Sequence, residues 1–249
     1  YKFEKGKTYF FSQKNLTDIN MSMMGQEINM STDSKMKMRF EIVERKDKNL
    51  EIITSIDSML VKSTNPMQGG EQINNGEGIV GKRTKIIMDP AGKVISKIEI
   101  DSSALTKMNM SFSGTNENMM RLSSKPAAIG ESWQNIDTLK MNIGPSAGVD
   151  IIQTTDMKIE GKEKYEGNDC LKISIIQKQV INGAIAAEGQ GIGMEGSTVM
   201  KGYGYFDYKN GLMLNLELAG EGNITMNLTE QGMSMPMNQK SKTVVTLIK

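Results

Sequence analysis

Histidine is absent from this chain of 249 residues, and cysteine occurs once, at Cys170. Without histidine the sequence lacks the usual general base, the Ser-His-Asp and Cys-His catalytic systems and the commonest metal ligand. One cysteine excludes a disulfide within these residues and a Cys-rich zinc site. Because Cys170 lies in the strand-like stretch "NDCLKISII", we interpret it as a buried, unreactive thiol.

Two further features are missing. No apolar run approaches the roughly 18 residues that a membrane-spanning helix needs. The net charge is only +1, with 30 Lys and Arg mixed among 29 Asp and Glu, so no basic face for nucleic acid or an anionic membrane is indicated. We therefore expect a protein that is not an enzyme, that needs no cofactor and that binds no nucleic acid.

The strongest positive feature is alternation of apolar and polar residues with a period of two. It runs through "KMKMRFEIVERK" at 35–46 and through "NLEIITSIDSMLV" at 49–61. Residues 84–100 predict a hairpin that turns at "DPAG", and residues 203–218 predict another that turns at "DYKNG", where Asn210-Gly211 is a strong turn signal. The chain is therefore predicted to be mainly antiparallel β.

The same series of pieces occurs twice in order, which indicates internal duplication. We predict two similar halves of strongly curved antiparallel sheet, open or half barrels that share a core, with a short helix or linker between them. The first half is residues 1–101, the linker is 102–129 and the second half is 130–249. Within the linker "ENMMRLSS" favours a helix capped by Asn116, and Trp133 is expected to anchor the start of the second half. Whether the halves are separate domains or one continuous sheet stays open.

Two glycine-rich stretches, at 67–78 and 186–196, occupy matching places in the two halves. "GQGIGMEG" resembles a dinucleotide-binding loop, but such a loop needs a following helix to hold the phosphate. Both flanks here predict strands, so we interpret the stretches as loops between strands.

Methionine is abundant, with 22 Met against 6 Phe, 6 Tyr and 1 Trp. One hypothesis is a Cu(I) site, because soft ions favour thioethers and Pro236 could break the strand so that Met233, Met235 and Met237 converge. The favoured hypothesis is apolar packing, because the methionines occupy positions where the alternation requires an apolar residue.

A flexible, methionine-lined concave face would suit a lipid, an acyl chain or a hydrophobic segment of a partner. The candidate ligand-binding residues are Met36, Met38, Phe40 and Met213. The alternatives are a structural or interaction module that contacts another envelope protein, and a fully packed sandwich without a pocket.

The opening "KGKTYFFSQ", the central "SSKPAAIGESW" and the two hairpins followed by alternating strands resemble uncharacterised exported proteins and lipoproteins of Bacteroidetes-type cell envelopes. At a coarser level the layout is similar to open-barrel lipoprotein carriers. The resemblance implies a periplasmic or outer-membrane-anchored protein whose removed signal peptide and lipidated cysteine precede Tyr1. It supplies no catalytic residues.

Overall fold

The computed structural model describes residues 1–23, 25–66, 69–101, 119–142, 148–187, 190–228 and 232–248. Within these ranges there is no α-helix. The strands are β1 (Thr8–Met23), β2 (Gln26–Lys46), β3 (Asn49–Asn65), β4 (Gly70–Asn74), β5 (Arg83–Met88), β6 (Val94–Glu99), β7 (Ser132–Asn142), β8 (Gly148–Tyr165), β9 (Asn168–Ala187), β10 (Gln190–Asp207), β11 (Leu212–Leu228) and β12 (Met233–Ile248).

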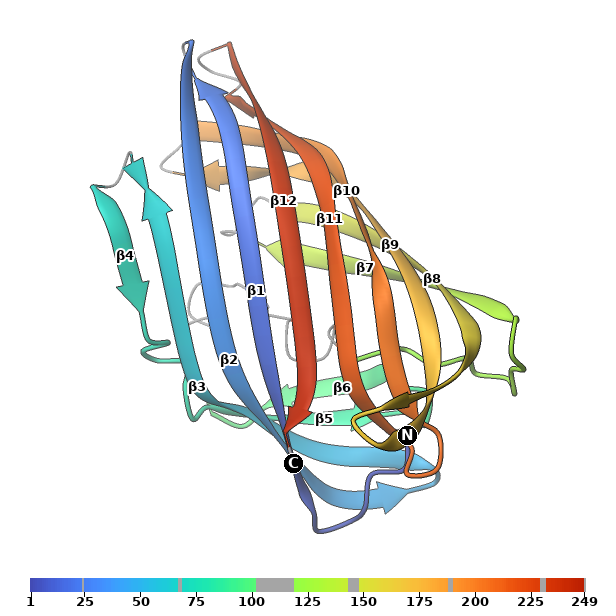
Figure 1. Cartoon of the computed structure of the whole chain (residues 1–249). Helices are drawn as coiled ribbons and strands as arrows, with labels where there is room; N and C mark the ends of the chain where they lie inside the picture. The colour runs from blue at the N-terminus through green and yellow to red at the C-terminus, as the bar shows by residue number, and fades with distance from the viewer. Residues whose placement is uncertain are drawn as a thin grey trace.

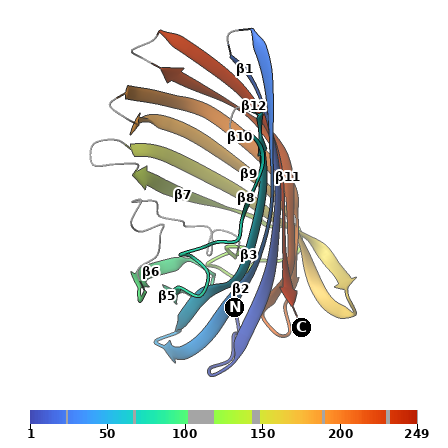
Figure 2. The ribbon, with the colours of Figure 1, turned by 90° about the vertical axis from the view of Figure 1, so that its left-hand side faces the viewer.

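All of these strands belong to one 12-stranded antiparallel sheet (Figure 1). Its order is β6-β5-β3-β2-β1-β12-β11-β10-β9-β8-β7, and β4 pairs with the far end of β3. The sheet is open, with β6 and β7 as the two ends of this order. It curls around a concave side, which opens to the left in Figure 2.

The predicted fold of two curved half sheets with a helix or linker between them is wrong. β1 pairs with β12 from Phe10–Ile248 to Met21–Met237, so the first and last strands join everything into one sheet. The alternation of apolar and polar residues indicates which face of a strand is buried, but it does not indicate which distant strand pairs with it. The pairing of β1 with β12 therefore could not be predicted from the sequence.

The expected helix between the halves is also not found in the described part of that region. Residues 119–131 form no helix and no strand, and 102–118, including Asn116, lie outside the described residues. The boundaries 1–101, 102–129 and 130–249 and the internal duplication stay predictions.

The predicted hairpins are confirmed. β5 and β6 pair around "DPAG", and β10 and β11 pair around "DYKNG", where Gly211 has φ 68°. The β2–β3 turn lies between the two alternating stretches 35–46 and 49–61, with Asp47 and Lys48 at positive φ. Local turn chemistry therefore determines these connections.

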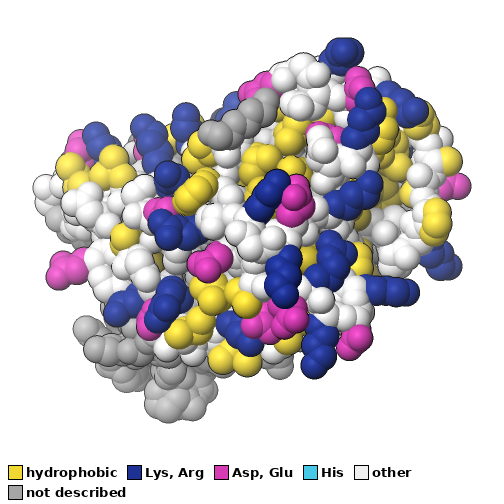
Figure 3. Space-filling model, turned by 90° about the horizontal axis from the view of Figure 1, so that it is seen from below, with side chains coloured by type: hydrophobic (Ala, Val, Ile, Leu, Met, Phe, Trp, Pro, Cys, Tyr) yellow, Lys and Arg dark blue, Asp and Glu magenta, His cyan; other side chains and the backbone are white. Residues whose placement is uncertain are grey.

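The main core covers the lower part of the concave face. Phe11, Phe40, Leu50 and Ile52 are buried there, and the rings of Phe11 and Phe40 meet edge to face with centroids 5.1 Å apart. Cys170 is also buried, as expected. The outer surface at the lower end carries Lys and Arg interspersed with Asp and Glu (Figure 3).

Glycines on the concave face of β10 and β11 allow unusually close backbone approach. A Cβ on Gly202 would lie 1.8 Å from the carbonyl oxygen of Glu217, and one on Gly220 would lie 1.9 Å from that of Val199. These strands therefore need glycine at the inward positions, where they curve tightly.

The prediction that 186–196 is an inter-strand loop is wrong for the described residues of that stretch, because its glycines lie in a strand that curves. Residues 190–196 belong to β10, and Gly196 pairs with Ile224 of β11. A Cβ on Gly196 would lie 2.3 Å from the carbonyl oxygen of Asn223. Glycine here indicates a curved strand rather than a loop.

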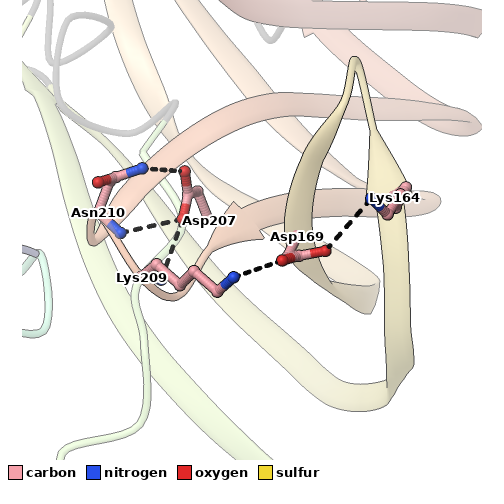
Figure 4. Close-up of polar contacts among 5 residues, drawn as sticks. All are labelled: Lys164, Asp169, Asp207, Lys209 and Asn210. Carbon is pink, nitrogen blue, oxygen red and sulfur yellow. Dashed lines mark hydrogen bonds and ion pairs between the residues drawn. The ribbon is translucent and has the colours of Figure 1, made fainter.

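The β10–β11 turn is held by a buried carboxylate (Figure 4). Asp207 Oδ1 accepts hydrogen bonds from the backbone N–H groups of Lys209 and Asn210, both at 3.0 Å, and Oδ2 accepts one from the Asn210 amide at 2.6 Å. The Lys209 ammonium reaches Asp169 of the neighbouring hairpin, and this contact lowers the pKa of the Asp169 carboxyl.

We expect Gly202→Ala and Gly220→Ala each to lower the free energy of unfolding by at least about 1–3 kcal/mol, because the new methyl group forces two backbones apart. Urea denaturation measures this loss. Gly161→Ala in β8 is the matched control, since a Cβ there meets nothing within 4 Å and should cost within about 0.5 kcal/mol. Equal losses in all three variants would contradict the close approach.

We expect Asp207→Ala to lower the free energy of unfolding by about 3 kcal/mol, because it removes a buried, charged acceptor that receives three hydrogen bonds in the turn. Asp169→Ala removes an exposed ion pair from the same region and should change stability little, since such pairs are screened by water. Thermal unfolding of both variants tests the difference. A larger loss in the Asp169 variant would argue against a structural role for Asp207.

Candidate functional site on the concave face

A cavity of about 260 Å³ lies on the concave face, between the β5–β6 hairpin and the strands β7, β8, β9 and β11. Its lining residues are Gly92, Lys93, Val94, Lys97, Met119, Met120, Arg121, Asn135, Asp137, Thr138, Gln153, Thr155, Met157, Ile175, Gln177, Leu216 and Leu218.

The cavity floor follows one row of paired residues across the sheet. Leu218 of β11 pairs with Gly202 of β10, Gly202 with Ile175 of β9, and Ile175 with Met157 of β8. Leu218, Ile175 and Met157 line the cavity, whereas Gly202 between them is not part of its lining. The floor of the cavity is therefore apolar.

Residues Met119–Leu122, which we call the strap, cross between the two ends of the open sheet. On one side the Leu122 N–H donates to the carbonyl oxygen of Ala91 in the β5–β6 turn, at 2.8 Å. On the other side Trp133 Nε1 and Asn135 Nδ2 of β7 both donate to the carbonyl oxygen of Arg121, at 2.9 Å each. The strap thus links the β5–β6 hairpin to β7. The expected role of Trp133 as the anchor of a second half stays a prediction.

Two side chains hold the strap against the sheet. The sulfur of Met120 occupies the space above Gly204, where a Cβ would lie only 2.0 Å from it. The Tyr1 hydroxyl donates to the carbonyl oxygen of Met120 at 2.8 Å, and burial strongly raises the pKa of that hydroxyl, which keeps it neutral and able to donate.

The wall formed by β8 and β9 is polar although it is buried. Gln153 and Thr155 are each only 7% exposed and face the cavity. The Gln179 amide donates to Gln153 Oε1 at 2.8 Å. The cavity therefore combines an apolar floor with polar groups that could orient a ligand.

The charged groups on the cavity lining are mostly cationic. Arg121 forms a half-buried ion pair with Asp137, and the exposed Lys93 and Lys97 belong to the same lining. Three cations against one carboxylate favour an anionic group.

The ligand-binding residues that the sequence proposed do not line this cavity. Met38, Phe40 and Met213 belong to the main core, each 2% exposed or less, and Met36 is 6% exposed beside Gln13 of β1. Their role in binding stays a prediction. Met38 and Phe40 instead pack together in the main core on the concave face.

The proposed copper ligands Met233, Met235 and Met237 lie on β12, which is continuous where the sequence predicted a break. Pro236 does not break the strand, because β12 runs from Met233 to Ile248. The pairing of β1 with β12 ends at Met237, so the missing N–H of Pro236 removes no bond from that ladder. Met235 and Met237 are buried on the concave face, whereas Met233 is half-buried. Among the described residues no three His, Cys, Asp or Glu side chains could hold a metal together.

The sequence did not point to the strap or to the charged lining. Met119, Met120 and Arg121 lay inside a stretch interpreted as a linker or helix, and Asp137 was one of many scattered carboxylates. The sequence "MMR" at 119–121 does not indicate that Met120 packs above Gly204 or that the strap bonds to β7.

No protein-family model matches this chain, and no curated protein matches it. Among solved structures it is similar to a DUF1329 family protein from Desulfovibrio piger, with 10% sequence identity and a TM-score of 0.19 over 96% of this chain and 84% of that one. A similarity this low carries no argument about function. In the described part of the chain no helix is long and apolar enough to cross a membrane.

We expect Met120→Ala to lower the free energy of unfolding by about 2–5 kcal/mol, because it empties the slot above Gly204 and loosens the strap. Met120→Leu keeps most of the volume and should cost less than about 1.5 kcal/mol. Chemical denaturation of both variants makes the comparison. Similar, small losses would mean that the strap is not anchored by this side chain.

Proposed function

We propose that this protein is a non-enzymatic cell-envelope protein that binds a single apolar chain carrying an anionic group, in the cavity on the concave face. The observation that supports the proposal most is the pairing of an apolar floor with a cationic lining. Met157, Ile175 and Leu218 form the floor, while Lys93 and Lys97 lie on the β5–β6 side of the same cavity.

The size of the cavity favours a small ligand. Pockets for drug-sized ligands range over about 300–1,000 Å³. The present volume of about 260 Å³ lies just below that range, which suits one short acyl chain better than a lipid with two chains. A carboxylate or phosphate at one end of that chain would lie near the cationic side chains of the lining.

Placement in the cell envelope rests on the resemblance of the chain to exported proteins and lipoproteins of Bacteroidetes-type bacteria. An envelope protein would meet free acyl chains and lipids, so this placement and the proposed ligand agree. Attachment through a lipid upstream of Tyr1 is part of the same proposal.

A second candidate function, an interaction module, is favoured by the outer face of β7–β9. Ile136, Ile152 and Val180 are 61%, 47% and 51% exposed there, and Ile152 lies directly opposite Val180. Exposed apolar neighbours of this kind are typical of surfaces that contact other proteins. Co-purification of a stoichiometric partner that Ile152→Lys abolishes would favour this function.

To test the proposed function, the full chain is stripped of bound lipid and titrated calorimetrically with decanoate below its micelle concentration. We expect one binding site, and we expect the double variant Lys93→Glu/Lys97→Glu to weaken it about tenfold, the equivalent of about 1.4 kcal/mol. Both side chains are exposed, so the variant should fold normally.

The matched control is Lys178→Glu/Lys201→Glu, which changes two exposed lysines on the outer face by the same charge. Decyltrimethylammonium has a chain of the same length with a cationic head and should bind more weakly than decanoate. If decanoate does not bind, or if the control weakens binding as much as the lining variant, the proposal fails.

A further inference from the structure

A second group of apolar residues lies on the concave face, far from the main core. It is centred on Met21, Ile28, Ile224, Met235 and Met237, with further residues packed around it. Six of its members are methionines, which we call the distal methionine cluster: Met21, Met30, Met194, Met226, Met235 and Met237. They come from β1, β2, β10, β11 and β12 at the end of the sheet that is uppermost in Figure 1.

The pairing of the strands brings these methionines side by side. Met21 lies directly opposite Met237, and Met226 lies directly opposite both Met235 and Met194. Side chains directly opposite each other have Cβ atoms about 4.5–5.5 Å apart, which is closer than the roughly 7 Å between alternate residues of one strand. Neighbouring thioethers can therefore converge without a loop folding inward.

A belt of polar side chains separates this cluster from the main core. Asn15 Nδ2 donates to Ser34 Oγ at 3.2 Å, and Gln239 Nε2 donates to Ser241 Oγ at 2.8 Å. Thr17 lies 3.4 Å from Ser241 through their hydroxyl groups. The distal methionine cluster is thus a distinct site and not an extension of the packing around Phe40.

The chemistry of the cluster selects for a soft ion. The residues of this cluster are methionine, isoleucine and leucine, so the sulfur atoms that it offers are all thioethers. The chain has no histidine, and its one cysteine is buried in the lower part of the sheet. Thioethers favour Cu(I), whereas Zn²⁺ and Mg²⁺ prefer nitrogen, thiolate or oxygen ligands.

We propose that the distal methionine cluster binds Cu(I) through the thioethers of Met21, Met226, Met235 and Met237. The flexible methionine side chain has three rotatable bonds, which lets four sulfurs from three adjacent strands approach one ion. This site is independent of the acyl-chain cavity, because the two share no residue.

The first test uses the full chain titrated with Cu(I) in the absence of oxygen against a competing chelator, and with Ag(I) as a redox-inert probe. We expect one ion per chain by native mass spectrometry and no adduct with Zn²⁺. The variant Met21→Leu/Met226→Leu/Met235→Leu/Met237→Leu should weaken binding at least about 100-fold, because it removes all four ligands and keeps the apolar volume.

The matched control is Met36→Leu/Met38→Leu/Met88→Leu/Met157→Leu, which removes the same number of thioethers from buried positions elsewhere. It should bind Cu(I) as the unaltered chain does, and so should Cys170→Ala. Unchanged binding in the cluster variant, or equal loss in the control, would overturn the proposal.

The second test observes the site in the unaltered protein. In the unaltered protein with ¹³C-labelled methionine methyl groups, Ag(I) should shift the signals of Met21, Met226, Met235 and Met237 and leave those of the main core in place. Signals are assigned with single Met→Leu substitutions. Shifts confined to other methionines, or no shift at saturating Ag(I), would refute the site.

Discussion

The architecture depends on the close approach of the backbones of β10 and β11. At Gly202 and Gly220 the neighbouring carbonyl oxygen occupies the place that a Cβ would take, so no other residue type fits without moving a strand. Tight curvature at this point turns a long open sheet around a concave face. Gly202 pairs with Leu218 and with Ile175, so the close approach lies in the same row of residues as the cavity floor.

The strap bridges the two ends of the open sheet. Its peptide groups bond to the carbonyl oxygen of Ala91 in the β5–β6 turn on one side, and to the side chains of Trp133 and Asn135 of β7 on the other. Its side chains serve the interior as well, with Met120 seated above Gly204. The strap therefore contributes to both the shape of the sheet and the lining of the cavity.

The sequence was informative where structure is decided locally. Alternation identified the strands, and "DPAG" and "DYKNG" identified two turns, because a turn depends on the backbone preferences of a few adjacent residues. It failed where distant segments meet: nothing in Phe10 or Ile248 reveals that β1 pairs with β12, and that pairing makes one sheet out of two expected halves. None of the residues that line the candidate site was predicted from the sequence. The pairing of five strands brings together Arg121, Asp137 and the cavity floor around Gly202. That pairing cannot be predicted from a single sequence.

The abundance of methionine has different meanings in different parts of the sheet. Met38 and Met213 fill the main core, where any apolar side chain of similar volume would serve. In the distal methionine cluster, by contrast, thioethers face one another across adjacent strands, behind a polar belt that packing alone does not require. Composition and spacing along one strand could not distinguish core methionines from the distal methionine cluster, because the neighbouring methionines of the cluster belong to different strands. The register is the basis on which the proposed metal site differs from the sequence hypothesis of Met233, Met235 and Met237: it keeps Met235 and Met237, leaves out Met233 and adds Met21 and Met226.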